Sequence, residues 1–139
     1  MKSLLVPFSL LVTLGCSAQK NIPQVVKDAF ASKFPNVVVT KWDKEDNDFE
    51  ANFSKDAKTM SATFDAKGIW LETETDISVK ELPATIVSYM EEHYKGEKIK
   101  EAAIIVTSKA EMYEVEVKDK DVLFDTSGKF LKVEETEED

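Results

Sequence analysis

Apolar residues recur at helical spacing in two stretches of the chain, one after Pro23 and the other after Pro83. Proline fits the first turn of a helix, where the N–H that it lacks would have no partner. Pro35 and Gly96 are typical of helix ends. The pattern therefore predicts two helices, whose apolar positions are Val25, Val26, Ala29, Phe30 and Phe34 in one and Ile86, Val87, Met90 and Tyr94 in the other.

Strict alternation of apolar and polar residues follows each predicted helix. It is clearest at residues 49–54, 59–64 and 113–118. A period of two indicates strands with one buried and one wet face, usually in an antiparallel sheet. The segments Asp65–Gly68 and Asp125–Gly128 are typical of hairpin turns, in which glycine can adopt a positive φ.

The chain matches itself at an offset of 60 residues. Among the coinciding pairs are Ile22-Pro23 with Leu82-Pro83, Phe34 with Tyr94, Phe64-Asp65 with Phe124-Asp125, Gly68 with Gly128, and Trp70-Leu71 with Phe130-Leu131. A fixed period indicates a repeated structural unit. We therefore predict an α+β fold of two tandem repeats, each one helix packed on a four-stranded antiparallel sheet, with a polar linker at residues 73–81.

The first 18 residues are typical of a secretory signal peptide. Lys2 gives a positive start, an apolar run extends from Leu4 to Leu14, and small residues follow. The run is shorter than the roughly 20 residues of a membrane-spanning helix, and no later segment approaches that length. The predicted organisation is a signal peptide at 1–18, repeats at 19–80 and 81–134, and an acidic tail at 135–139.

Cys16 is the only cysteine, and two cleavage patterns compete around it. Residues 16–18 have the small-x-small form of general signal peptidase sites. Residues 13–16, Thr-Leu-Gly-Cys, resemble a lipobox with Thr13 where leucine is usual, which would make Cys16 a lipidated first residue. Either pattern leaves the folded part without a thiol, which excludes disulfides and a cysteine nucleophile. The mature protein is expected to be periplasmic or lipid-anchored to the envelope.

The formal net charge is −9, with 27 acidic residues against 18 basic ones, all of which are lysine. Such a surface repels nucleic acid and anionic lipid headgroups. Without arginine the chain also lacks the planar fork that binds phosphate in a bidentate manner. We expect no nucleic-acid partner; a protein or peptide partner is compatible with this charge.

Several segments resemble the PepSY-like family, which is also described as resembling β-lactamase inhibitory protein. They are Ile22-Pro23-x-x-Val26, Lys41-Trp42, residues 64–74 and residues 123–131, and the resemblance covers residues 21–134. It implies an exported envelope protein of Bacteroidetes-type bacteria with no assigned enzymatic activity. The inhibitor for which the group is named binds its enzyme through a concave sheet surface, but none of its contact residues can be matched here.

No segment has the pattern of a catalytic, cofactor or metal site. His93 is the only histidine and has no candidate nucleophile or fellow ligand in sequence, so a helix-end histidine is the simpler interpretation. The acidic turn at residues 43–48 lacks the glycine and the final glutamate of an EF-hand loop, and a solvated hairpin is the expectation. We predict a protein that is not an enzyme and holds no cofactor or metal.

Trp42, Trp70 and Phe130 are the candidate binding residues, because large aromatic side chains often anchor interfaces. The competing interpretation is that each packs against its own helix. The sequence thus favours a non-catalytic, inhibitor-like binding module of unknown ligand. The alternative is a structural or stress-related periplasmic protein without a specific ligand.

Overall fold

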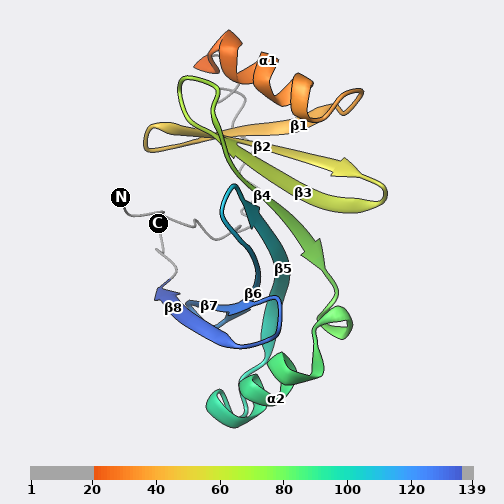
Figure 1. Ribbon diagram of the computed structural model, residues 1–139, viewed down its shortest axis with the longest axis vertical. Helices are drawn as coiled ribbons and strands as arrows, with labels where there is room; N and C mark the ends of the chain where they lie inside the picture. The colour runs from red at the N-terminus through yellow and green to blue at the C-terminus, as the bar shows by residue number, and fades with distance from the viewer. Residues whose placement is uncertain (1–20, 136–139) are drawn as a thin grey trace. The chain divides into compact units, whose positions relative to one another are not determined.

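The computed structural model describes residues 21–135; the predicted signal peptide with Cys16, and residues 136–139, lie outside this range. The same order of elements occurs twice (Figure 1). The N-terminal half contains α1 (Gln24–Lys33), β1 (Val39–Glu45), β2 (Asp48–Lys55), β3 (Lys58–Phe64) and β4 (Trp70–Ile77). The short 3-10 turn η2 (Val79–Glu81) leads to the C-terminal half, with α2 (Ala84–His93), β5 (Ile99–Thr107), β6 (Glu111–Val117), β7 (Lys120–Asp125) and β8 (Phe130–Glu135).

The strands are hydrogen-bonded neighbours in chain order, from β1 to β8. The α+β class is therefore confirmed, but the prediction of two separate four-stranded sheets is wrong, because all eight strands belong to one sheet. Alternation within a strand indicates which face is buried and does not indicate which strands are neighbours. By its contacts the described chain divides into two compact units, residues 21–76 with 105–110, and residues 77–104 with 111–135.

In the N-terminal half, α1 covers one face of its strands (Figure 1). Val26 and Phe30, four residues apart and on one side of the helix, are its buried residues. Phe30 lies edge-on to Phe53, with ring centroids 5.1 Å apart. The strands contribute alternate residues to this core, which confirms the predicted alternation. The prediction that the other face is wet is wrong for part of β2, because Glu50 and Asn52 on that face are 8% and 7% exposed. The buried members of the core are Ile22, Val26, Phe30, Phe34, Trp42, Phe49, Ala51, Phe53, Ala62 and Phe64.

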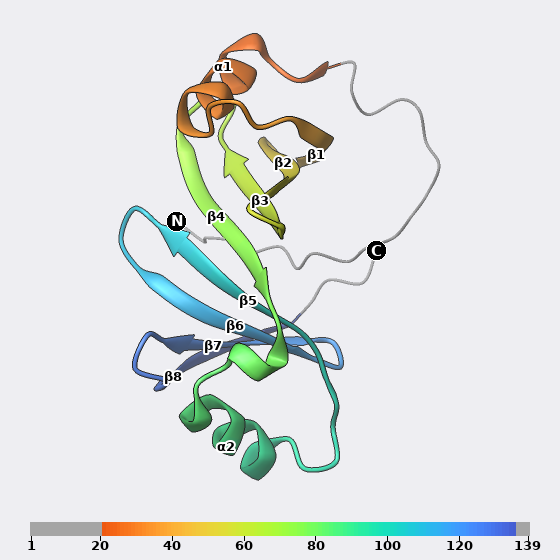
Figure 2. The same cartoon turned by 90° about the vertical axis from the view of Figure 1, so that its right-hand side faces the viewer.

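In the C-terminal half α2 likewise covers one face of its strands (Figure 2). Most of the core side chains there are aliphatic and smaller than the aromatic ones of the first half. Ile86 and Met90 are the buried residues of α2, at the positions equivalent to Val26 and Phe30. The core of the C-terminal half consists of Leu82, Ile86, Met90, Ala102, Val115, Val117, Val122 and Phe124. We call the sheet surface that meets the helix in each half the helix face.

Both predicted hairpin turns are confirmed. Gly68 N–H donates to the carbonyl of Asp65 at 3.0 Å, and Gly128 N–H donates to that of Asp125 at 2.9 Å. Each aspartate side chain also accepts two backbone N–H bonds from within its turn. With a further bond from the Ser127 hydroxyl, these bonds lower the pKa of Asp125.

Two boundaries differ from the sequence-based expectation. Pro23 is the cap of α1 and precedes its first helical residue, and Pro83 caps α2 in the same way. The linker expected at 73–81 is wrong in part, because β4 continues to Ile77. A capping box then opens η2, in which Glu81 accepts from the N–H of Ser78 at 2.7 Å. A strand can contain the polar residues at 73–77, because alternate positions face opposite sides of the sheet and only one side packs against the helix.

Substituting Gly128 by alanine should destabilise the protein through two effects. Its φ of +83° is strained for alanine, and the added Cβ would lie 1.9 Å from Thr85 Oγ1. Gly96 is a matched control, since its φ is +77° but a Cβ there meets nothing within 4 Å. We expect Gly96→Ala to cost about 1–2 kcal/mol from backbone strain alone. Gly128→Ala should cost about 1–3 kcal/mol more from overpacking.

Urea unfolding of both variants checks this prediction. Equal losses in the two variants would show that the contact between the hairpin and α2 is not tight.

Candidate functional site

The sheet surface turned away from the helix carries polar side chains, several of which are buried. We call this surface the polar face. In the N-terminal half the strand register places Glu50 opposite Asp43 and Asn52 opposite Ser61, with Glu74 next to Ser61 on β4. Apart from Asp43, these residues are at most 9% exposed. Buried polar groups require hydrogen-bond partners, so such a face is costly for a fold that needs it only as packing.

The N-terminal polar face is organised around Asp43. Lys41 Nζ lies 2.8 Å from one carboxylate oxygen of Asp43, and Asn52 Nδ2 donates to the other at 3.0 Å. The side-chain oxygen of Asn52 is buried and accepts no hydrogen bond. Burial raises the pKa of Glu50 to about 7, and the nearby Asp43 adds to the shift. At neutral pH this face can therefore exchange a proton.

The C-terminal polar face carries three acids side by side on β6, β7 and β8. Asp121 pairs directly with Glu116 on one side and with Glu134 on the other. We call these three residues the acid row. Directly opposed like charges destabilise a sheet. Lys100 Nζ lies 3.5 Å from Glu116, and Lys132 forms an ion pair with Glu134.

Asp121 is the central member of the acid row and has no partner. Its side chain is 1% exposed, and neither carboxylate oxygen has a hydrogen bond. Burial raises the pKa of Asp121 to about 7, and Glu116, Glu134 and Glu101 push it in the same direction. The positive charge of Lys100 lowers the pKa of Asp121, but its effect is smaller than each of the others. Near pH 7 the carboxyl group is therefore partly protonated, because its ionised form has neither solvent nor a donor.

The structure places the three predicted aromatic residues on the helix face. Trp42 is 8% exposed, and its ring is edge-on to Phe30 with centroids 5.9 Å apart. Trp70 is half-buried, its indole N–H donates to Thr73 Oγ1 at 2.9 Å, and Lys33 Nζ lies 3.7 Å from its ring centroid. Trp42 is thus part of the core, whereas Trp70 keeps some accessible surface.

Phe130 takes the place of Trp70 in the C-terminal half, and an aromatic stack covers it. Its ring is stacked on Tyr89 with centroids 5.2 Å apart, and His93 stacks on Tyr89 at 3.9 Å. His93 Nδ1 donates to the carbonyl of Tyr89 at 3.0 Å, a helix-end arrangement. His93 and Lys33 are equivalent in the two helices, so each half places a basic side chain over its aromatic residues.

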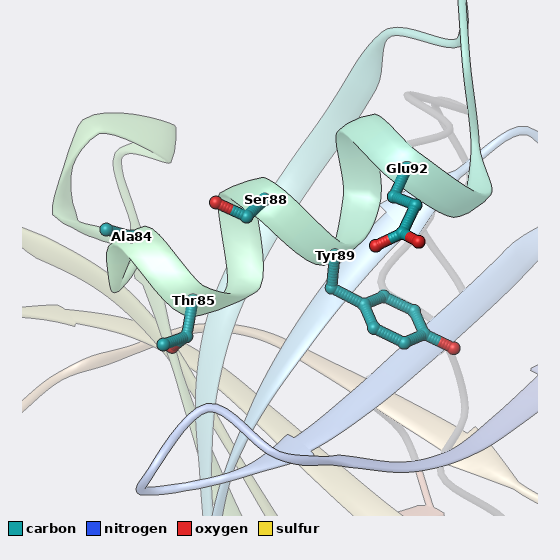
Figure 3. A pocket seen from close by; sticks show the side chains of 5 residues that line it. All are labelled: Ala84, Thr85, Ser88, Tyr89 and Glu92. Carbon is teal, nitrogen blue, oxygen red and sulfur yellow. The ribbon is translucent and has the colours of Figure 1, made fainter.

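A shallow depression of about 430 Å³ lies along α2 beside Tyr89 (Figure 3). Its other lining residues are Ala84, Thr85, Ser88 and Glu92, which come from the same helix. Phe130 and His93 both stack on the ring of Tyr89. No group of catalytic side chains converges on this depression.

The acidic turn forms the β1–β2 hairpin, with Asp46 at a φ of 50°. Within residues 21–135, no three acidic, histidine or cysteine side chains are arranged to hold a metal ion. The lipidation candidate Cys16 lies outside the described residues.

Sequence reasoning missed Asp121, Asn52 and Tyr89. The self-alignment does contain a signal for Asp121, since at offset 60 it stands where the first copy has Ser61. An acid replacing a small neutral residue at a repeat position is a departure that the fold does not require. Its burial between Glu116 and Glu134 became visible only with the strand register.

Comparison with family models gives a match to one described as "Putative beta-lactamase-inhibitor-like, PepSY-like". The model matches twice, at residues 17–61 and 57–132. The chain belongs to the PepSY-like family. A double match suggests a repeated unit, although the second match begins at residue 57, within the N-terminal half. Among curated proteins, none matches this PepSY-like chain.

Solved structures of similar fold come from Bacteroides species. A BLIP-like protein of Bacteroides fragilis is 25% identical with a TM-score of 0.70, covering 86% of this chain and 90% of its own. A DUF2874 family protein of Bacteroides ovatus is 21% identical with a TM-score of 0.72, covering 83% and 88%. A protein of Bacteroides eggerthii described as periplasmic is 15% identical with a TM-score of 0.73, covering 83% and 89%. These similarities confirm the fold.

None of these descriptions names a reaction or a ligand. Between residues 21 and 135, the PepSY-like chain has no helix long and apolar enough to cross a membrane.

The stability of the protein should fall as the pH rises from about 4 to above 7. The folded pKa of Asp121, about 7, lies above its ordinary value of 3.8, so the folded state holds this proton longer than the unfolded state. The contribution of this proton to the free energy of unfolding is fully present below pH 4 and is lost as the pH rises past 7. Asp121→Asn keeps the shape without the charge, and should stabilise the protein at pH 8 by about 1–3 kcal/mol.

Urea unfolding between pH 4 and pH 8 measures this effect. Glu91→Gln, an exposed acid on α2, is the control and should follow the wild-type profile. An Asp121→Asn profile as steep as that of the wild type over this range would contradict the prediction, although Glu50 is expected to leave a residual slope.

Proposed function

We propose that this PepSY-like protein is a non-catalytic, exported binding module of the bacterial envelope whose ligand is a protein or peptide. The observation that carries the proposal is the burial of polar groups on the polar face. Glu50, Asn52 and Asp121 are buried there, and Asn52 and Asp121 each have buried oxygens that accept no hydrogen bond. A sheet face needed only for folding would be more stable with neutral, satisfied side chains, so retaining these groups supports a role in binding.

Two further observations support an exported, non-catalytic role. The family description is inhibitor-like, which suggests a protein partner. Residues 1–18 have the pattern of a signal peptide, and a relative of similar fold is described as periplasmic. The binding surface would be the polar face, with Trp70 and Phe130 on the helix face as a second candidate surface.

The alternative is a structural or stress-related periplasmic protein without a specific ligand. The burial of Trp42 favours it, because one of the three candidate anchors is occupied by the core. Trp70 is likewise partly covered, by Lys33.

Affinity capture from an envelope extract, with the mature protein as bait, tests the proposal. A polar-face bait carries Glu50→Gln and Asp121→Asn, one buried acid from each half. A control bait carries Asp28→Asn and Glu91→Gln, which remove the same charge from exposed helix positions. We expect a protein that the wild-type and control baits recover and the polar-face bait loses.

Identical proteins recovered by all three baits would contradict binding through this surface. Baits carrying Trp70→Ala or Phe130→Ala then report on the second surface. If no recovered protein depends on any of these residues, the structural alternative is favoured.

Anchoring through Cys16 is a separate proposal. If the lipobox-like pattern is used, the bacterial host should attach labelled fatty acid to the wild-type protein and not to Cys16→Ser. Gel autoradiography after growth with labelled palmitate distinguishes the two. Unlabelled wild-type protein in the periplasmic fraction would instead indicate cleavage after Ala18 and a free protein.

A further inference from the structure

We propose that the acid row binds one basic side chain, lysine or arginine, of a partner protein, and that Asp121 releases its proton to solvent when this side chain binds. The inference rests on the proposed binding function and names the chemistry of the partner. The basic side chain stays protonated throughout, and the exchange is one proton on Asp121 for one cationic group beside it.

The row has cations at both ends and none in the middle. Lys100 pairs with Glu116 and also donates to the carbonyl of Lys118 at 2.6 Å, so its position is fixed from two sides. Lys132 pairs with Glu134 along the same strand. Asp121 lies directly between the two acids and has no ion pair or hydrogen bond.

Charge balance explains why the central position suits a cation. With Asp121 protonated, each flanking acid is balanced by its own lysine. Once Asp121 ionises, the row carries an uncompensated buried charge, and Glu101 of β5 adds to the repulsion. A bound ammonium or guanidinium group would supply the missing positive charge. It would also supply several N–H donors. The two carboxylate oxygens of Asp121, which accept no hydrogen bond in the unbound protein, could accept from these donors.

Access to the row runs through its flanks. The side chains of Glu116 and Glu134 are 19% and 23% exposed, and those of Lys100 and Lys132 are 51% and 49% exposed. A partner's cation therefore meets the flanking acids first. The ion pair of Lys132 with Glu134 joins a half-exposed lysine to its neighbour along the strand, and ion pairs that solvent reaches are weak. Separation of this pair would open the path to Asp121, which is closed in the unbound protein.

The site belongs to the C-terminal half alone. The equivalent row of the N-terminal half is Asn52, Ser61 and Glu74. That row has one acid where the C-terminal row has three, so the electrostatic attraction for a single cation would be weaker there. A metal ion is the less suitable occupant, because no three ligands converge on one point within residues 21–135.

Titration calorimetry with a blocked peptide of alternating lysine and alanine tests the inference. Measurements at pH 7 in two buffers of different ionisation heat give the number of protons released. The wild-type protein should release about half a proton per bound peptide, because Asp121 is about half protonated there. Its affinity should rise about tenfold from pH 6 to pH 8, as the ionised fraction rises from about a tenth to about nine tenths.

Asp121→Asn should abolish both the proton release and the rise in affinity with pH. Glu91→Gln, which removes one charge from an exposed position on α2, is the control and should keep the wild-type proton release. Glu50→Gln removes the acid of the N-terminal polar face whose pKa is also about 7, and it locates the source of the proton. The release should persist in Glu50→Gln if Asp121 is the source. If Asp121→Asn fails to fold, Glu134→Gln replaces it and should weaken binding several-fold more than Glu91→Gln does.

Three results would overturn the inference. One is equal affinity and equal proton release for Asp121→Asn and Glu91→Gln, which would mean general attraction to an acidic protein. Another is proton release that Glu50→Gln abolishes, which would move the site to the N-terminal half. The third is calcium chloride alone causing the release that depends on Asp121, which would identify a metal site. An envelope protein captured equally by wild-type and Asp121→Asn baits would leave the proposed function intact while removing this site.

Discussion

The packing of one short helix against four strands constrains everything else in each half. Both helices are ten residues long, and a helix of this length is only marginally stable in water without a packing surface. Each presents two buried apolar side chains, so most of the core must come from the strands. Most of the large apolar residues of the strands therefore lie on the helix face, and many polar residues of the same strands lie on the other face.

This constraint explains why the two halves agree in their cores and differ elsewhere. Val26 and Phe30 correspond to Ile86 and Met90, and Phe64 corresponds to Phe124. The polar face has no helix to accommodate, although several of its residues are buried as well. There the first copy has Ser61 and the second has Asp121, at the same place in the sheet. The two copies thus differ on the face that does not pack against a helix.

Much of the fold could be predicted from the sequence because it depends on local patterns. Alternation at residues 49–54 and 113–118 identified β2 and β6, and the Asp-x-x-Gly segments identified the hairpins. The joining of all strands into one sheet could not be predicted, because neither copy contains a signal for what lies beyond its last strand. Trp42 shows a similar limit. It follows a lysine in an exposed-looking segment, and only the approach of Phe30 from α1 places it in the core.

The candidate site was harder to predict than the fold for a specific physical reason. Acids are abundant in this chain, so an acid in the sequence carries little information until its neighbours are known. Asp121 differs from the other acids by having no partner while being buried between two like charges, and both properties depend on register across β6, β7 and β8. His93 illustrates the reverse case. As the only histidine it was conspicuous in the sequence, yet it stacks on Tyr89 at a helix end and converges with no other reactive group. In a strongly acidic protein, an unpaired buried carboxyl is therefore a more specific observation than a rare residue type, because the fold must be stable in spite of it.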